Sequence, residues 1–133
     1  MKHSVFVTRR IPEEGLDRLR QSCEVMVWPD ALPPSQQQIR ELAAGCHGLI
    51  TLLSDSVDAA TMDAIGPQLQ VVANFAVGYN NIDVLAAAKR GIRVGNTPDV
   101  LTDATADIAV GLLLSAARHF RESILQVDAL EWK

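Results

Sequence analysis

The chain has 133 residues, of which 48% are hydrophobic and 21% charged, with a formal net charge of −4 at pH 7 and a pI near 5.2. This length suits one domain with a buried core, and the acidic balance argues against a nucleic-acid binder, which normally carries a basic face. Two cysteines make no disulfide framework, no signal peptide is visible, and the longest apolar stretch, 108–117, is too short to span a bilayer, so we expect a cytoplasmic protein that does not enter a membrane.

Short β-branched runs alternate with helical runs along the chain. Predicted strands cover residues 4–8, 24–28, 48–53, 70–75 and 92–95. Predicted helices begin at Pro12, after a Ser35 cap, at Asp58 and at Ile82, and a long helix capped by Thr102 covers 103–121. Residues 122–133 continue a helical pattern loosely and read as a truncated tail.

The alternation of strands and helices determines the expected fold class. Five strand–helix units in a row predict an α/β domain, a doubly wound five-stranded parallel sheet with helices on both faces. The strands are continuous apolar runs, which is typical of strands covered on both faces. We expect the flavodoxin-like strand order 2-1-3-4-5 and one domain over residues 1–121.

The segment after the fourth strand, Ala76 to Asp83, is a candidate binding loop. Ligands of parallel sheets bind beyond the carboxyl ends of the strands. Gly78 permits a tight turn, Asn80 or Asn81 could cap the next helix, and free N–H groups near a helix start attract anions. The loop therefore predicts a small carboxylate bound by the amides of Val77 and Gly78, unless it is only an ordinary strand-to-helix turn.

Residues 73–118 carry a family resemblance. They contain Ala-Val-Gly-Tyr-Asn-Asn-Ile-Asp at 76–83, Ala-Ala-Lys-Arg-Gly-Ile-Arg-Val at 87–94 and Asn-Thr-Pro-Asp-Val-Leu-Thr-Asp-Ala-Thr-Ala-Asp at 96–107. This run resembles the D-isomer-specific 2-hydroxyacid dehydrogenases, and its last part resembles their glyoxylate and hydroxypyruvate reductase branch. The chain is similar to the substrate-binding half of such an enzyme, which reduces a small 2-keto acid with NAD or NADP as cofactor.

The resemblance implies roles for individual residues. The loop Ala76-Val77-Gly78 would give backbone amides to the substrate carboxylate, and Leu52 and Leu53 would line the same pocket. Val77 and Thr105 would lie near the nicotinamide. The alternatives are that the two leucines belong to the core and that Thr105 is merely a residue of the first helical turn.

The machinery for catalysis is missing from these 133 residues. No Gly-x-Gly-x-x-Gly turn for a dinucleotide occurs, so the nucleotide-binding Rossmann domain is absent. The catalytic Arg, Glu and His implied by the resemblance would lie beyond residue 133, and none of His3, His47 and His119 matches that His. We therefore assign no catalytic and no metal-binding residue, and we expect the chain alone to bind no cofactor tightly and to be inactive.

The apolar helix 103–121 raises the question of association. A helix that is apolar nearly all round must be covered on several sides. In the resembling enzymes it lies where domains and subunits meet, which implies a homodimer for the longer protein. In this chain it could fold back on its own sheet as a monomer or pair with a second copy.

Two other classes share the expected fold. A signalling receiver needs acidic residues after the first strand, where Thr8-Arg9-Arg10 stands, although Asp55 follows the third strand. A flavodoxin needs a phosphate loop at the same place. An isolated flavodoxin-like domain with no catalytic role also fits the sequence.

Overall fold

The computed structural model describes residues 2–130. The chain divides after Pro98 into two compact units, residues 1–98 and 99–133. The first unit contains all five strands, and the second contains the last two helices of the described chain.

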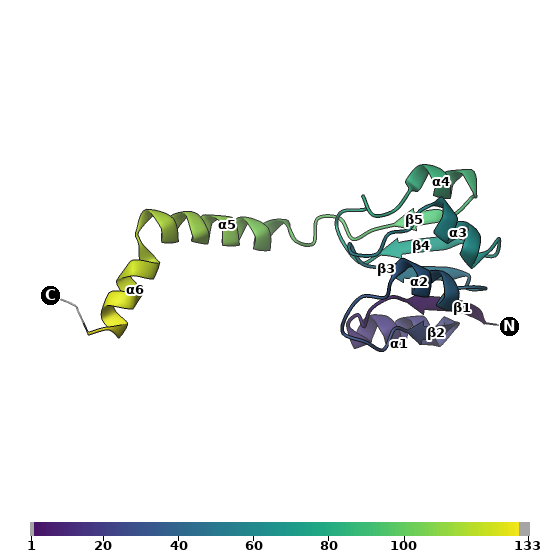
Figure 1. Ribbon diagram of the computed structural model, residues 1–133, viewed down its shortest axis with the longest axis horizontal. Helices are drawn as coiled ribbons and strands as arrows, with labels where there is room; N and C mark the ends of the chain where they lie inside the picture. Colours follow the sequence, from purple (N-terminus) through teal and green to yellow (C-terminus); the bar gives the residue numbers. More distant parts are fainter. Residues whose placement is uncertain (1, 131–133) are drawn as a thin grey trace. The chain divides into compact units, whose positions relative to one another are not determined.

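The first unit is built on one parallel sheet of five strands (Figure 1). Its order is β2-β1-β3-β4-β5, and every neighbouring pair is parallel. The predicted fold class and strand order are confirmed. The strands are β1 His3–Val7, β2 Cys23–Val27, β3 Gly48–Thr51, β4 Val71–Asn74 and β5 Arg93–Gly95.

Four helices cover the two faces of this sheet. The largest cluster of buried side chains joins β1, β3 and β4 to helices α2–α4. Alternate residues of β1, Val5 and Val7, point to the other face and pack with Leu16 of α1. Helices therefore lie on both faces of the sheet, as predicted. The helices are α1 Glu13–Ser22, α2 Gln36–Leu42, α3 Ala59–Ile65 and α4 Val84–Lys89.

Short-range sequence signals place several helix ends correctly. Ser35 caps α2 through a capping box in which its side chain accepts from Gln38 N and its own N–H donates to Gln38 Oε1. Asp58 caps α3 by accepting from Thr61 N at 2.8 Å. Gly91 has φ +69°, the left-handed conformation expected for a glycine that ends α4.

Two predicted caps are wrong. Asp83, and neither Asn80 nor Asn81, caps α4, and its carboxylate accepts from Ala86 N at 2.8 Å. Thr102 is the first residue of the next helix instead of its cap. Asn81 is not free to cap because it donates to Leu52 O and Asp55 O, whereas the residue before α5 is Leu101, which makes no side-chain cap bond.

The second unit contains two helices instead of the single helix predicted over 103–121. Helix α5 covers Thr102–Ala117 and α6 covers Phe120–Asp128, so the expected tail from residue 122 is helical as far as Asp128. The break lies at His119, whose φ of 51° and ψ of 43° are left-handed and end the helical path. Residues 131–133 of the tail lie outside the described residues.

Helix α5 is apolar but contains no buried residue. Ile108, Leu112 and Leu113 are each about two-thirds exposed, at 67%, 65% and 68%. Over residues 2–130, no helix has the length and apolar character needed to cross a membrane. The fold-back and second-copy alternatives for this helix both stay predictions.

Candidate functional site

The candidate site lies at the carboxyl ends of β3 and β4, where two loops run side by side. Leu52 is half-buried and Leu53 is 59% exposed in the loop after β3, while Ala76 is buried and Val77 is 38% exposed in the loop after β4. A Cβ placed on Gly78 would lie 3.5 Å from Leu53 Cδ2. The structure therefore brings together the predicted residues of the two loops.

Two asparagine side chains tie these loops to each other. Asn81 Nδ2 donates to the carbonyl oxygens of Leu52 and Asp55, at 3.0 and 2.9 Å. Asn74, which is 2% exposed, donates from Nδ2 to Gly78 O at 2.7 Å and to Asn81 Oδ1 at 3.0 Å. The loop after β4 is thus held against the loop after β3 by side-chain amides.

A buried threonine anchors the same network in the sheet. Thr51 is the last residue of β3, is fully buried, and donates through Oγ1 to Asn74 Oδ1 at 2.8 Å. Both hydrogens of the Asn74 side-chain amide are therefore used and its Oδ1 accepts from Thr51; Asn81 Nδ2 lies 3.3 Å from the same Oδ1 but already donates its two hydrogens to Leu52 O and Asp55 O at shorter distances. Sequence reasoning missed Asn74 because nothing in its neighbours distinguishes it from other strand residues.

Asp55 organises the loop after β3 from inside. It is 1% exposed and accepts hydrogen bonds from Thr8 Oγ1, from Leu52 N at 2.8 Å and from Ser54 Oγ at 3.1 Å. Arg9 Nη2 lies 3.7 Å from its Oδ1. A receiver needs an accessible phospho-accepting carboxylate after this strand, and the enclosed Asp55 does not provide one.

The backbone amides expected to bind a carboxylate have no acceptor among residues 2–130. Phe75 N, at the start of the loop, donates to Thr51 O at 2.7 Å. In contrast, within residues 2–130 the N–H groups of Ala76, Val77 and Gly78 donate to no protein group. Two adjacent N–H groups at Val77 and Gly78 in an exposed loop form an arrangement that can bind an anion.

Gly78 follows the predicted strand end without a left-handed backbone. The positive-φ glycines of the described chain are Gly45, Gly66 and Gly91. A Cβ at Gly78 would make only ordinary contact with Leu53. That the missing Cβ lets a ligand approach the backbone stays a prediction.

Thr105, the other predicted cofactor residue, lies in the second unit. It is exposed in the first turn of α5, and its N–H donates to Leu101 O at 2.9 Å. This bond is the ordinary pairing of a first helical turn. The role of Thr105 near a cofactor stays a prediction.

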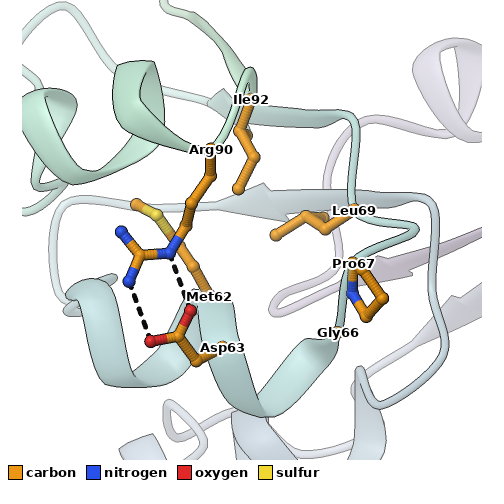
Figure 2. Close-up of a pocket in the computed structure, with 7 residues that line it drawn as sticks. All are labelled: Met62, Asp63, Gly66, Pro67, Leu69, Arg90 and Ile92. Atoms are coloured by element: carbon orange, nitrogen blue, oxygen red, sulfur yellow. Dashed lines mark hydrogen bonds and ion pairs between the residues drawn. The ribbon is translucent and has the colours of Figure 1, made fainter.

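A separate hollow lies at the opposite end of the strands (Figure 2). Leu69 and Ile92, which line it, come just before the sheet strands β4 and β5 begin. Arg90 donates to both carboxylate oxygens of Asp63, at 2.7 and 2.8 Å, and the guanidinium holds the pKa of Asp63 below its ordinary value. Because both polar groups are paired with each other, we assign this hollow no binding role. In residues 2–130 no cluster of three His, Cys, Asp or Glu side chains is placed to hold a metal ion.

Comparison with known proteins connects this arrangement with a family of enzymes. A glyoxylate reductase from Korarchaeum cryptofilum is 49% identical over 133 residues, which is all of this chain and 40% of the relative. The crystal structure of a protein from Thermus thermophilus matches 98% of this chain and 42% of its own with a TM-score of 0.87 and 40% identity. An NADPH-dependent glyoxylate/hydroxypyruvate reductase from Sinorhizobium meliloti, solved in complex with NADP and malonate, matches 97% of this chain and 39% of its own with a TM-score of 0.75 and 33% identity.

The matches cover nearly the same share of each relative. The chain spans about 40% of the length of the curated relatives it matches. Residues 5–129 match the family model described as D-isomer specific 2-hydroxyacid dehydrogenase, catalytic domain. The chain therefore belongs to the D-isomer specific 2-hydroxyacid dehydrogenase family.

Proposed function

We propose that this chain provides the substrate-carboxylate wall of an NAD(P)-dependent oxidoreductase that reduces glyoxylate, hydroxypyruvate or a similar small 2-keto acid. The observation that carries the proposal is the pair of N–H groups at Val77 and Gly78, which have no acceptor in the described protein. They lie in a loop that Asn74 and Asn81 hold in place. The malonate and NADP named for the Sinorhizobium meliloti relative support a carboxylate ligand and a nicotinamide cofactor.

In this proposal the two amides bind and orient the substrate. Each donates a charge-assisted hydrogen bond to one carboxylate, which places the adjoining keto carbon at a set distance from the loop. Leu53 is exposed beside Gly78 and offers an apolar surface to the small side group of the substrate. Leu52 and Ala76 are less exposed than Leu53 and Val77.

The residues present do not fit a whole dinucleotide. A reduced nicotinamide, when bound, supplies the hydride of this reaction class. The sequence contains no Gly-x-Gly-x-x-Gly turn to hold its pyrophosphate. We therefore assign the phosphate-binding turn and the acid–base residues to sequence beyond this chain, and keep only Val77 and Thr105 as candidates for contact near the nicotinamide.

The proposal is tested by titrating the chain with oxamate, an unreactive analogue of a 2-keto acid, and following backbone amides by NMR. We expect saturable shifts centred on Val77 and Gly78. Oxamide, the neutral analogue with the same shape, is the matched control and should give no comparable shifts at equal concentration. Shifts absent from this loop, or equal shifts with oxamide, would contradict a carboxylate site.

Activity of the chain alone is a separate expectation. Mixed with NADH or NADPH and glyoxylate, the purified chain should cause no steady loss of reduced-cofactor absorbance. Steady turnover would show that the sequence holds a cofactor site we have not recognised. Sustained inactivity together with specific oxamate binding would distinguish the proposed wall from a flavodoxin-like domain with no catalytic role.

Two further expectations concern organisation. We propose that residues 1–121 act as the substrate-binding domain of a longer homodimeric protein and that the helical region 103–121 contacts another domain or subunit. The exposed side chains of Ile108, Leu112 and Leu113 support this, since large exposed apolar patches favour association. Light scattering at several concentrations should show a monomer–dimer equilibrium if α5 pairs with a second copy.

A further inference from the structure

The residues that follow β5 contact the candidate loop directly. Asn96 Nδ2 donates to Val77 O at 2.7 Å. The next residue, Thr97, donates its backbone N–H to Ala76 O at 2.9 Å. Two consecutive carbonyl groups of the loop are therefore held by two consecutive residues from another part of the chain.

These two bonds determine where the neighbouring N–H groups point. In a planar trans peptide the C=O and the N–H of the same unit point in opposite directions. Holding Ala76 O toward Thr97 directs the Val77 N–H away from it, and holding Val77 O toward Asn96 does the same for the Gly78 N–H. Both N–H groups thus face away from the segment after β5, on the same side of the loop.

The two bonds differ in what a substitution can change. Thr97 uses its backbone, so almost any residue at position 97 would keep that bond. Asn96 uses its side chain, is half-buried, and makes this one side-chain hydrogen bond within residues 2–130. Asn96 therefore supplies the one side-chain hydrogen bond to the Val77–Gly78 peptide within residues 2–130, in a loop that Asn74 and Asn81 also hold.

We propose that Asn96 is a positioning residue that directs the Gly78 N–H toward the substrate carboxylate. This inference rests on the proposed function of the loop. It assigns no contact between Asn96 and the substrate, because the side chain acts through the Val77–Gly78 peptide. The structural alternative is that Asn96 merely stabilises the fold beside Tyr79, Val84 and Val94, with which it lines a shallow hollow.

The geometry can be tested without a ligand. NMR should detect a scalar coupling across the hydrogen bond between Asn96 Nδ2 and the carbonyl carbon of Val77. In Asn96→Ala the carbonyl shift of Val77 and the amide shift of Gly78 should both move, while Ala76, held by Thr97, should change little. No coupling, together with an unmoved Gly78 amide in Asn96→Ala, would overturn the inference.

Binding of oxamate then tests the role. Asn96→Ala should raise the dissociation constant for oxamate about tenfold, as expected when one hydrogen bond to a charged group is no longer aligned. Asn96→Asp should raise the dissociation constant further, because the new carboxylate repels both Val77 O and the ligand. The matched control is Asn80→Ala, since Asn80 is exposed in the same loop and its side chain has no partner in residues 2–130.

The outcomes separate the inference from the proposed function. Thermal unfolding of all three variants should stay close to that of the unchanged chain, because water can replace one bond to a partly exposed carbonyl. Equal oxamate affinity in the unchanged chain, Asn96→Ala and Asn96→Asp would overturn the positioning role and leave the carboxylate site intact. Loss of affinity only in proportion to lost thermal stability would overturn it in favour of the structural alternative. Failure of the unchanged chain to bind oxamate would overturn the proposed function, and the positioning role with it.

Discussion

Replacing Asn74 by alanine should be among the most destabilising polar substitutions in the first unit. Asn74 is 2% exposed and uses both atoms of its amide, accepting from Thr51 Oγ1 and donating to Gly78 O and Asn81 Oδ1. The fully buried Thr51 hydroxyl would lose its acceptor, which costs about 1–3 kcal/mol. The loop partners Gly78 and Asn81 can recover water, so each of those bonds contributes only about 0.5–1.5 kcal/mol. The expected loss is about 2–6 kcal/mol in the free energy of unfolding.

Urea denaturation measures this loss if the probe reports on the first unit. Trp28 packs against the main core, so its fluorescence in a Trp132→Phe background follows that unit. A double-mutant cycle with Thr51→Val sharpens the assignment. Once the hydroxyl is removed, no buried donor is stranded, so the double variant should be more stable than the sum of the single effects predicts, by about 1 kcal/mol. A loss below about 1 kcal/mol for Asn74→Ala, with no coupling to Thr51, would refute the reasoning.

Local features of the first unit lead to three smaller predictions. Asp58→Ala should cost about 1 kcal/mol through loss of the α3 cap. Hydrogen bonds from the first turn of α3 lower the pKa of Asp58. The part of this stabilisation that needs the charged carboxylate is therefore present above the ordinary carboxyl pKa and is lost as the pH falls through the lowered pKa. Denaturation midpoints of the unchanged chain and Asp58→Ala that stay equally separated at acid pH would contradict this. Gly91→Ala should cost about 1 kcal/mol because the φ of Gly91 is +69°; no atom lies within 4 Å of the added Cβ, so the cost comes from the backbone alone. Gly95→Ala is equally open and has no positive φ, so it should change the denaturation midpoint much less. Burial raises the pKa of the Cys46 thiol, so iodoacetamide at mildly alkaline pH should modify the half-buried Cys23 first, and mass spectrometry of timed samples showing the reverse order would contradict this.

The sheet could be predicted from the sequence because its signals are local. Continuous apolar runs separated by helical segments identify parallel strands, and the right-handed crossover rule leaves few orders. The first two predicted strands are shifted by one residue, and the last three are one or two residues too long, as at 48–53, where β3 ends at Thr51. Leu52 and Leu53 continue the apolar pattern, but their backbone leaves the sheet because Asp55 binds Leu52 N.

The end of the long predicted helix was placed less well than the strands. The apolar run ends at Ala117, but Phe120, Ile124 and Leu125 keep a helical spacing, and no proline or glycine stands between α5 and the end of α6. The break depends on the left-handed conformation of His119, which is uncommon outside glycine even though histidine adopts it more often than most residues. Sequence periodicity contains no signal for such a break.

The candidate site shows the same division. The loop Ala76–Gly78 was predicted from its place after the fourth strand and from the family resemblance, whereas Leu53 was implied by the resemblance alone. The polar side chains that hold the loop come from positions 51, 74, 81 and 96, and the structure brings them together through contacts up to 29 residues apart in sequence.

The sequence by itself determined the α/β class and the strand order and placed the candidate loop after a strand end, because hydrophobic periodicity and helix signals act over a few residues. Only the tertiary structure decided which amides remain without a partner and which way they point. That outcome depends on hydrogen bonds from Asn74, Asn81 and Asn96, whose side-chain amides could equally have faced water. An amide side chain both donates and accepts, so its partners are selected by the groups that folding brings within reach.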